Sequence, residues 1–198
     1  MCLRLAPLIL QHRNTGVLQT MAEVKGAAAG LQRNPLDMIA HAHTLQQDLC
    51  DALERIADGL PDDIDRRLCA RTAATLQFDI PLHHRDEEEA LFPRLLLRVT
   101  PDDGLGDILE RLSAEHSSDT DLGTEIAEFL DTLAEGQRPK NPDMAGYMLR
   151  AFFESYRRHI HWENTLVMPL ARKRLTDEDY AAIAAVMDRN RAETQGAA

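Results

Sequence analysis

Apolar residues recur along the chain at the spacing of amphipathic helices, and no run of β-branched residues alternates as a strand would. We predict four long helices over residues 35–59, 62–99 (with residue 63 as an alternative start), 106–133 and 142–175. A fifth, short helix begins near Thr176. Because turn-rich segments connect the long helices, the expected fold is all-α, an antiparallel up-down-up-down four-helix bundle with a short C-terminal helix.

Three prolines lie inside the predicted second and fourth helices: Pro81, Pro93 and Pro169. A proline removes a helical hydrogen-bond donor, and its ring collides with the preceding turn. We therefore expect the helices to bend at these points and to continue. Thr176 and Asp179 have the spacing of a capping pair, which predicts the start of the terminal helix, while the tail after it is expected to fray.

Length and composition indicate one domain with extensions. We expect a flexible N-terminal extension over residues 1–33, in which Met21 is a second possible start. The main domain spans residues 34–175, and an accessory helix and tail occupy residues 176–198. With 33 acidic against 22 basic residues and a formal charge of −11, the chain is not expected to bind nucleic acid.

The apolar N-terminal run ends at Gln11, too early for a signal core or a membrane span, so we expect no membrane partner and a cytoplasmic location. Three cysteines without a C-x-x-C pair fit a reduced compartment. Cys50 and Cys69 lie in apolar helical patterns and are expected to be buried.

One spacing, H-x3-E-x5-P, occurs twice, and a lone histidine precedes each copy at a similar distance. A match to one such motif is weak evidence, whereas two matches with the same lone histidine upstream are unlikely by chance. The two sets are His43, His83, Glu87 and Pro93, and His116, His159, Glu163 and Pro169.

Helical geometry sorts these residues by face, because positions i, i+3, i+4 and i+7 share one side of a helix. His83 and Glu87 continue an apolar stripe that runs from Cys69 to Leu91. His159 and Glu163 continue one that includes Leu166, whereas His161 points away.

The same geometry leaves other positions outside the core. His84, Asp86, Glu88 and Glu89 are expected to form a solvated charge run. His116 follows a stripe of leucines on the third helix. On the first helix we favour His43 as the inward residue, with His41 as the alternative.

Four imidazoles and two carboxylates among leucines need compensation, since an unpaired buried charge costs several kcal/mol. We therefore predict a metal site. Imidazole and carboxylate ligands suit iron, manganese or zinc, and two shared carboxylates favour a dinuclear centre, so the expected cofactor is two Fe ions. The predicted metal-binding residues are His43, His83, Glu87, His116, His159 and Glu163.

The segments HHRDEEEALFP and HIHWENTLVMP, and more weakly AEHSSD and AHTLQQDLC, resemble the signatures of the hemerythrin-like, or HHE cation-binding, family of non-haem di-iron bundles. The resemblance covers roughly residues 34–175. It implies that the four histidines are terminal ligands and that Glu87 and Glu163 bridge the irons. Ferritin-like proteins carry Glu before His as E-x-x-H, a pattern that this chain lacks.

Two departures from the family pattern matter. Oxygen-carrying hemerythrins have a fifth histidine one turn after the first on the third helix, where this chain has Thr120, so reversible oxygen carriage is not expected. The neighbouring Asp119 could ligate a metal or accept a hydrogen bond, and we expect it to face solvent. The four-His, two-Glu set is closer to bacterial proteins that repair iron-sulfur centres, but these have an N-terminal cysteine-containing domain and this chain has only Cys2 there.

The expected function is that of a cytoplasmic di-iron protein that binds or senses oxygen or nitric oxide, or that handles iron. Its partners would be a small diatomic ligand or peroxide. The alternatives are an enzyme of peroxidase or oxidase type, an iron-sulfur repair factor, and an interaction module whose histidines fill a polar core. Tyr156, one turn before His159, is either a hydrogen-bond donor near the site or an ordinary core-edge tyrosine.

Overall fold

The computed structural model describes residues 34–196. The predicted N-terminal extension and the alternative start at Met21 lie outside the described residues, so both stay predictions. Within the described part no helix has both the length and the apolar character that a membrane span requires.

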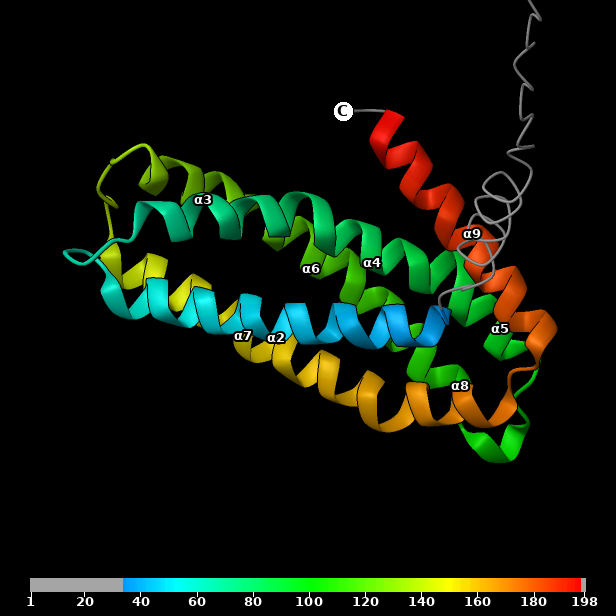
Figure 1. The fold of residues 1–198 in the computed structure, drawn as a ribbon. Helices are drawn as coiled ribbons and strands as arrows, with labels where there is room; N and C mark the ends of the chain where they lie inside the picture. Colours follow the sequence, from blue (N-terminus) through cyan, green and yellow to red (C-terminus); the bar gives the residue numbers. More distant parts are fainter. Residues whose placement is uncertain (1–33, 197–198) are drawn as a thin grey trace, which may run out of the picture. The chain divides into compact units, whose positions relative to one another are not determined.

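Four helical rods form the bundle, as predicted, and Figure 1 shows them side by side, with successive rods joined at opposite ends. The first rod, α2, packs against α7, and α3 packs against α6. The second and fourth rods are each made of several segments. The helices are α2 (Pro35–Gly59), α3 (Arg66–Ala74), α4 (Ile80–Asp86), α5 (Phe92–Leu96), α6 (Gly106–Ala134), α7 (Pro142–Trp162), α8 (Met168–Arg174) and α9 (Asp177–Gly196), with a 3₁₀ turn, η3 (Pro101–Asp103).

Side-chain caps determine where the rods begin. The Asn34 side chain accepts a hydrogen bond from the backbone N–H of Leu36 at 3.0 Å, and Pro35 occupies the first turn. Asp65 accepts from the N–H of Leu68 at 3.0 Å. The second rod therefore begins at Arg66, three or four residues later than predicted, because Asp65 is the residue that caps it.

Each of the three internal prolines follows a π turn, in which the backbone N–H groups reach one residue further back than in an α-helix. The π turns are η1 (Thr75–Asp79), η2 (Glu87–Leu91) and η4 (Glu163–Val167). A wider turn before a proline makes room for its ring and for the carbonyl that has lost a donor. The rods continue through the prolines, as predicted, and the π turns are the local distortion that allows it.

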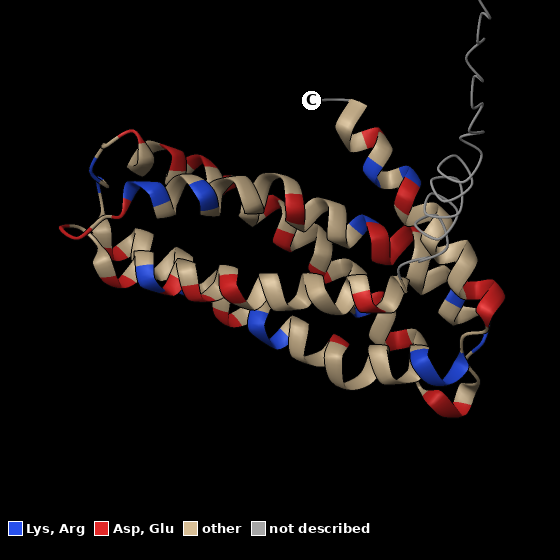
Figure 2. Ribbon diagram, viewed as in Figure 1, with Lys and Arg blue, Asp and Glu red and all other residues tan. Residues whose placement is uncertain are grey.

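Helix α9 is longer than predicted and continues to Gly196, so the tail is not frayed up to that residue. Thr176 and Asp179 form the predicted cap, with the Thr176 N–H donating to Asp179 Oδ2 at 3.0 Å. Asp86 on α4 accepts hydrogen bonds from Asn190 at 3.1 Å and pairs with Arg191 at 2.8 Å. In the ribbon of Figure 2, acidic and basic positions lie close to one another along α9.

The apolar core consists of two clusters, and five of the six predicted site residues lie between members of the two clusters along their rods. The sixth, His159, lies directly before Ile160, at the edge of one cluster. On α2, for example, Ile39 belongs to one cluster and Leu49 to the other, and His43 lies between them. Cys50 and Cys69 are free thiols, and both are buried, as predicted, in the cluster that contains Leu49. The bundle therefore has a polar layer between two apolar clusters.

Candidate metal centre

The structure brings all six predicted residues together in this layer, and none is more than 5% exposed. His41 is exposed and His43 is 1% exposed, so of the two candidates on the first helix the structure turns His43 inward. His161 lies on the exposed side of α7, as its position on the helix predicts.

One group of donor atoms gathers near His43 and His83. The Nε2 atom of His43 lies 3.4 Å from Glu87 Oε1 and 3.2 Å from Glu163 Oε2. The Nε2 atom of His83 lies 3.2 Å from Glu87 Oε2. One atom from each of these four residues lies within 4.8 Å of the others, a spacing that could hold a metal ion.

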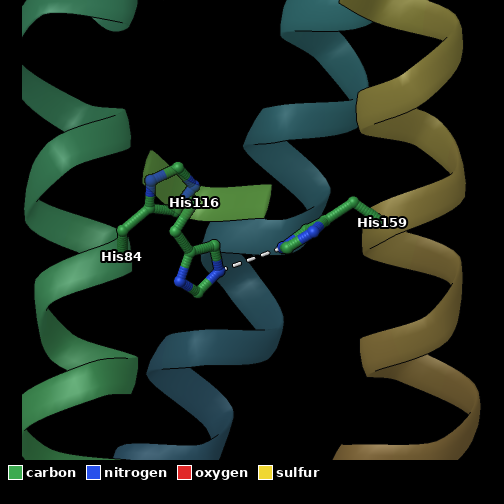
Figure 3. Close-up of side chains that lie close together, drawn as sticks. All are labelled: His84, His116 and His159. Atoms are coloured by element: carbon green, nitrogen blue, oxygen red, sulfur yellow. Dashed lines mark hydrogen bonds between the residues drawn. The ribbon is translucent and has the colours of Figure 1, made fainter. Parts of the chain in front are cut away.

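A second group gathers near His116 and His159, whose Nε2 atoms are 3.1 Å apart, as the dashed line in Figure 3 marks. The Nε2 atom of His159 lies 3.1 Å from Glu163 Oε1. The Nε2 atom of His116 lies 3.6 Å from the same oxygen and 3.4 Å from Glu87 Oε2. The two oxygens of Glu163 thus face different groups of histidines.

In three of the histidines, the ring nitrogen that points away from Glu87 and Glu163 contacts a side chain that orients the ring. Such partners fix the ring and leave the opposite nitrogen for a metal. The contacts are His43 Nδ1 to Asn164 Oδ1 at 2.8 Å, His116 Nδ1 to Glu88 Oε1 at 3.0 Å, and His159 Nδ1 to Glu115 Oε2 at 3.1 Å.

The inward-facing atoms show whether a metal fits. Among the described residues, the Nε2 atoms of His43 and His83 and both carboxylate oxygens of Glu87 and Glu163 are buried without a hydrogen-bond partner. Buried polar atoms without partners are costly and rare in native proteins. A cation held by these nitrogens and oxygens would satisfy them, and the donor set suits a transition metal.

Proton binding responds to the same charges. Burial opposes a charged imidazole, but Glu163 and Glu87 outweigh it and raise the pKa of His43 to about 10. The same balance raises the pKa of His116 to about 10. The neighbouring histidines hold the pKa of both glutamates well below the usual range, although burial acts in the opposite direction. The layer therefore retains its carboxylates as anions and attracts positive charge.

Comparison with protein-family models decides the relationship. Residues 34–171 match the model described as the hemerythrin HHE cation binding domain. The chain belongs to the hemerythrin family. The matched segment spans all four rods of this hemerythrin domain and every predicted site residue. Comparisons with curated proteins and with solved structures gave no significant match.

His84 corrects the sequence analysis, because it is 4% exposed where a solvated position was expected. Its ring stacks on that of His116, with centroids 4.0 Å apart and planes at 14°. Its Nε2 atom lies 3.1 Å from the Tyr156 hydroxyl, and its Nδ1 atom lies 3.3 Å from Thr120 Oγ1. Tyr156 is fully buried and contacts a histidine that sequence reasoning had left outside.

Three further expectations about exposure were wrong. Asp86 is 2% exposed because α9 covers it, and Asp119 is 8% exposed. Burial raises the pKa of Asp119 to about 6. Leu166 is 42% exposed, whereas Val167 is fully buried in its place, because the π turn after Glu163 shifts the inward face by one residue. Glu88 and Glu89 are exposed, as predicted.

A cavity of about 560 Å³ lies between α2 and the second rod and reaches His83. Its lining is mostly apolar. Gln46 also lines it and is 3% exposed, with an Oε1 atom that has no hydrogen-bond partner among the described residues. The cavity therefore borders one side of the polar layer at His83.

Proposed function

We propose that this hemerythrin domain holds a non-haem di-iron centre bridged by Glu87 and Glu163, and that the protein binds or senses oxygen or nitric oxide. The observation that carries the proposal is the set of converging buried nitrogens and carboxylate oxygens without hydrogen-bond partners. Two metals are favoured over one because Glu163 Oε2 faces His43 at 3.2 Å and its Oε1 faces His159 at 3.1 Å.

The roles of the chain's own residues follow from the geometry. His43 and His83 would hold one iron, and His116 and His159 the other. A di-iron centre supplies reversible electron transfer and binding of small ligands. The apolar clusters on both sides exclude water from the layer, which strengthens every electrostatic interaction in it.

The cavity beside His83 supports a small uncharged ligand. Oxygen and nitric oxide are neutral, and a mostly apolar lining does not hinder their approach. Ions would have to shed their hydration to follow the same route, which is costly.

Metal content and optical spectra test the proposal. Protein purified anaerobically from iron-replete cells should contain two irons per chain and should change its spectrum when oxygen or nitric oxide is added. Less than one metal per chain would contradict the di-iron centre. Full iron content with no spectral response to either gas would contradict the ligand-binding role while leaving the centre in place.

A second candidate is a di-iron enzyme of oxidase or peroxidase type, and the size of the cavity favours it. A volume of about 560 Å³ falls in the range of pockets that hold small organic molecules, far above the need of a diatomic gas. Incubation with hydrogen peroxide and an organic reductant distinguishes the candidates, since only an enzyme would give repeated turnover.

A further inference from the structure

Among residues 34–196, His84 is the only buried histidine that the six predicted site residues leave out. It comes from α4, directly after His83, and lies beside His116 and His159, as Figure 3 shows. One ring nitrogen from each of these three histidines lies within 4.8 Å of the others. Metal–nitrogen bonds of about 2.1 Å place donor atoms roughly 3 to 4 Å apart, which is compatible with this spacing.

The two nitrogens of His84 repeat the arrangement of the other histidines. His43, His116 and His159 each have Nδ1 held by an outer side chain, and their Nε2 atoms point inward. In His84, Thr120 holds Nδ1 at 3.3 Å. Its Nε2 atom points into the protein, where the Tyr156 hydroxyl lies 3.1 Å away in a fully buried environment.

Thr120 also shows which space the ring of His84 occupies. Thr120 lies one turn after His116 on α6. Its hydroxyl is a poor metal ligand and cannot do the work of an imidazole there. The space next to it contains the ring of His84, supplied from α4 instead. The sequence thus lacks a histidine on one helix, and the structure places one from another helix there.

We propose that His84 is a metal ligand and gives the iron near His116 and His159 a third imidazole. This proposal rests on the dinuclear centre proposed above. With three imidazoles at that metal, an external ligand would bind the other iron, next to His83 and the apolar cavity.

Two variants separate ligation from a purely structural role. His84→Ala removes the imidazole, whereas Tyr156→Phe removes only the hydroxyl that contacts it. His161→Ala on the exposed side of α7 is the matched control. Each protein is analysed for iron per chain and by Mössbauer spectroscopy, which reports the two irons as separate signals.

If His84 is a ligand, His84→Ala weakens one metal position by at least ~10-fold and shifts or removes one of the two iron signals. Tyr156→Phe and His161→Ala should retain both irons with the wild-type spectrum. Unchanged iron content and spectrum in His84→Ala would overturn the proposal. So would equal losses in His84→Ala and Tyr156→Phe, because His84 would then act only by holding the tyrosine.

A measurement on the wild-type protein covers the case in which His84→Ala does not fold. Loading with Co²⁺ shifts the exchangeable N–H proton of each ligating imidazole far outside the normal NMR range. A shifted signal assigned to the His84 ring supports the proposal, and its absence while those of His116 and His159 are present overturns it. Wild-type protein that binds less than one metal per chain would instead contradict the dinuclear centre itself.

Discussion

The Nδ1 atom of His43 donates to Oδ1 of Asn164 across 2.8 Å, from α2 to the π turn that begins at Glu163. The other half of the bundle has the same arrangement, in which Glu88 follows Glu87 and holds His116 at 3.0 Å. The residue after each of the two buried glutamates, Glu87 and Glu163, therefore orients the lone histidine of the other hairpin. These crossed contacts tie the two halves of the repeat together at the polar layer.

Loss of the Asn164 contact should weaken metal binding without touching a ligand. We expect Asn164→Leu to lower affinity at the His43 position by ~10–100-fold, because the imidazole loses the partner that fixes its tautomer and orientation. Competition with a chelator of known affinity measures the change. Thr165→Val, at the next exposed position, is the control, and equal affinities in the two variants would refute the role of Asn164.

The assignment of helix faces predicts two pairs of contrasting variants. His159→Ala and His43→Ala remove buried imidazoles and should lower the iron content to one per chain or less. His161→Ala and His41→Ala alter exposed positions and should retain the wild-type content. Iron analysis of the four purified proteins is the measurement. Equal iron in His159→Ala and His161→Ala, or in His43→Ala and His41→Ala, would show that the faces are wrongly assigned.

Removal of the metal should make stability depend on pH in the alkaline range. Without metal, the pKa values of His43 and His116 are raised to about 10, against 6.5 for an unfolded histidine. Their contribution to the free energy of unfolding is present in full below pH 6.5 and is lost as the pH rises through about 10. The thermal midpoint of metal-free protein should therefore fall between pH 7 and pH 10.

The loaded protein is the control for this prediction, since metal ions replace the protons and should keep the midpoint nearly constant over the same range. Parallel curves for the two forms would contradict the prediction.

Acid should remove the stabilisation that Asp179 of α9 contributes to the fold. Arg98 lies 2.7 Å from this carboxylate and, with the Thr176 cap, lowers its pKa to about 2. A lowered pKa stabilises the fold above the unfolded value of 3.8, and the stabilisation is lost as the pH falls through about 2. We expect Asp179→Asn to be less stable than wild type at pH 6, and the difference to shrink as the pH falls toward 2. Urea unfolding at both values measures this, and an equally large difference at pH 6 and at pH 2 would contradict it.

Helical periodicity predicted the fold and the inward position of six residues because those residues follow regular turns from apolar neighbours. It misplaced Leu166 because a π turn, which periodicity does not indicate, moves the inward face to Val167. The sequence does contain one signal of these turns, namely the proline that follows each of the two glutamates at the same spacing, Pro93 after Glu87 and Pro169 after Glu163.

Other errors came from contacts between distant segments. Asp86 is buried because α9 packs over it. The C-terminal helix was predicted to be short, so there was no reason to expect that it would reach Asp86. His84 is about 100° from His83 on the helix, at the edge of the stripe. Whether an edge position is buried depends on the size of the facing residue, here Thr120, which is small enough to admit a ring.

The outer partners of the histidines also differ in charge, and this difference bears on electron affinity. His116 and His159 are each backed by a carboxylate, from Glu88 and Glu115, whereas the partner of His43 is the neutral amide of Asn164. A carboxylate makes an imidazole a stronger electron donor, which would favour the ferric state of an iron bound there. If the layer holds the two irons proposed above, the position formed by His43 and His83, beside the cavity, would be the more easily reduced of the two.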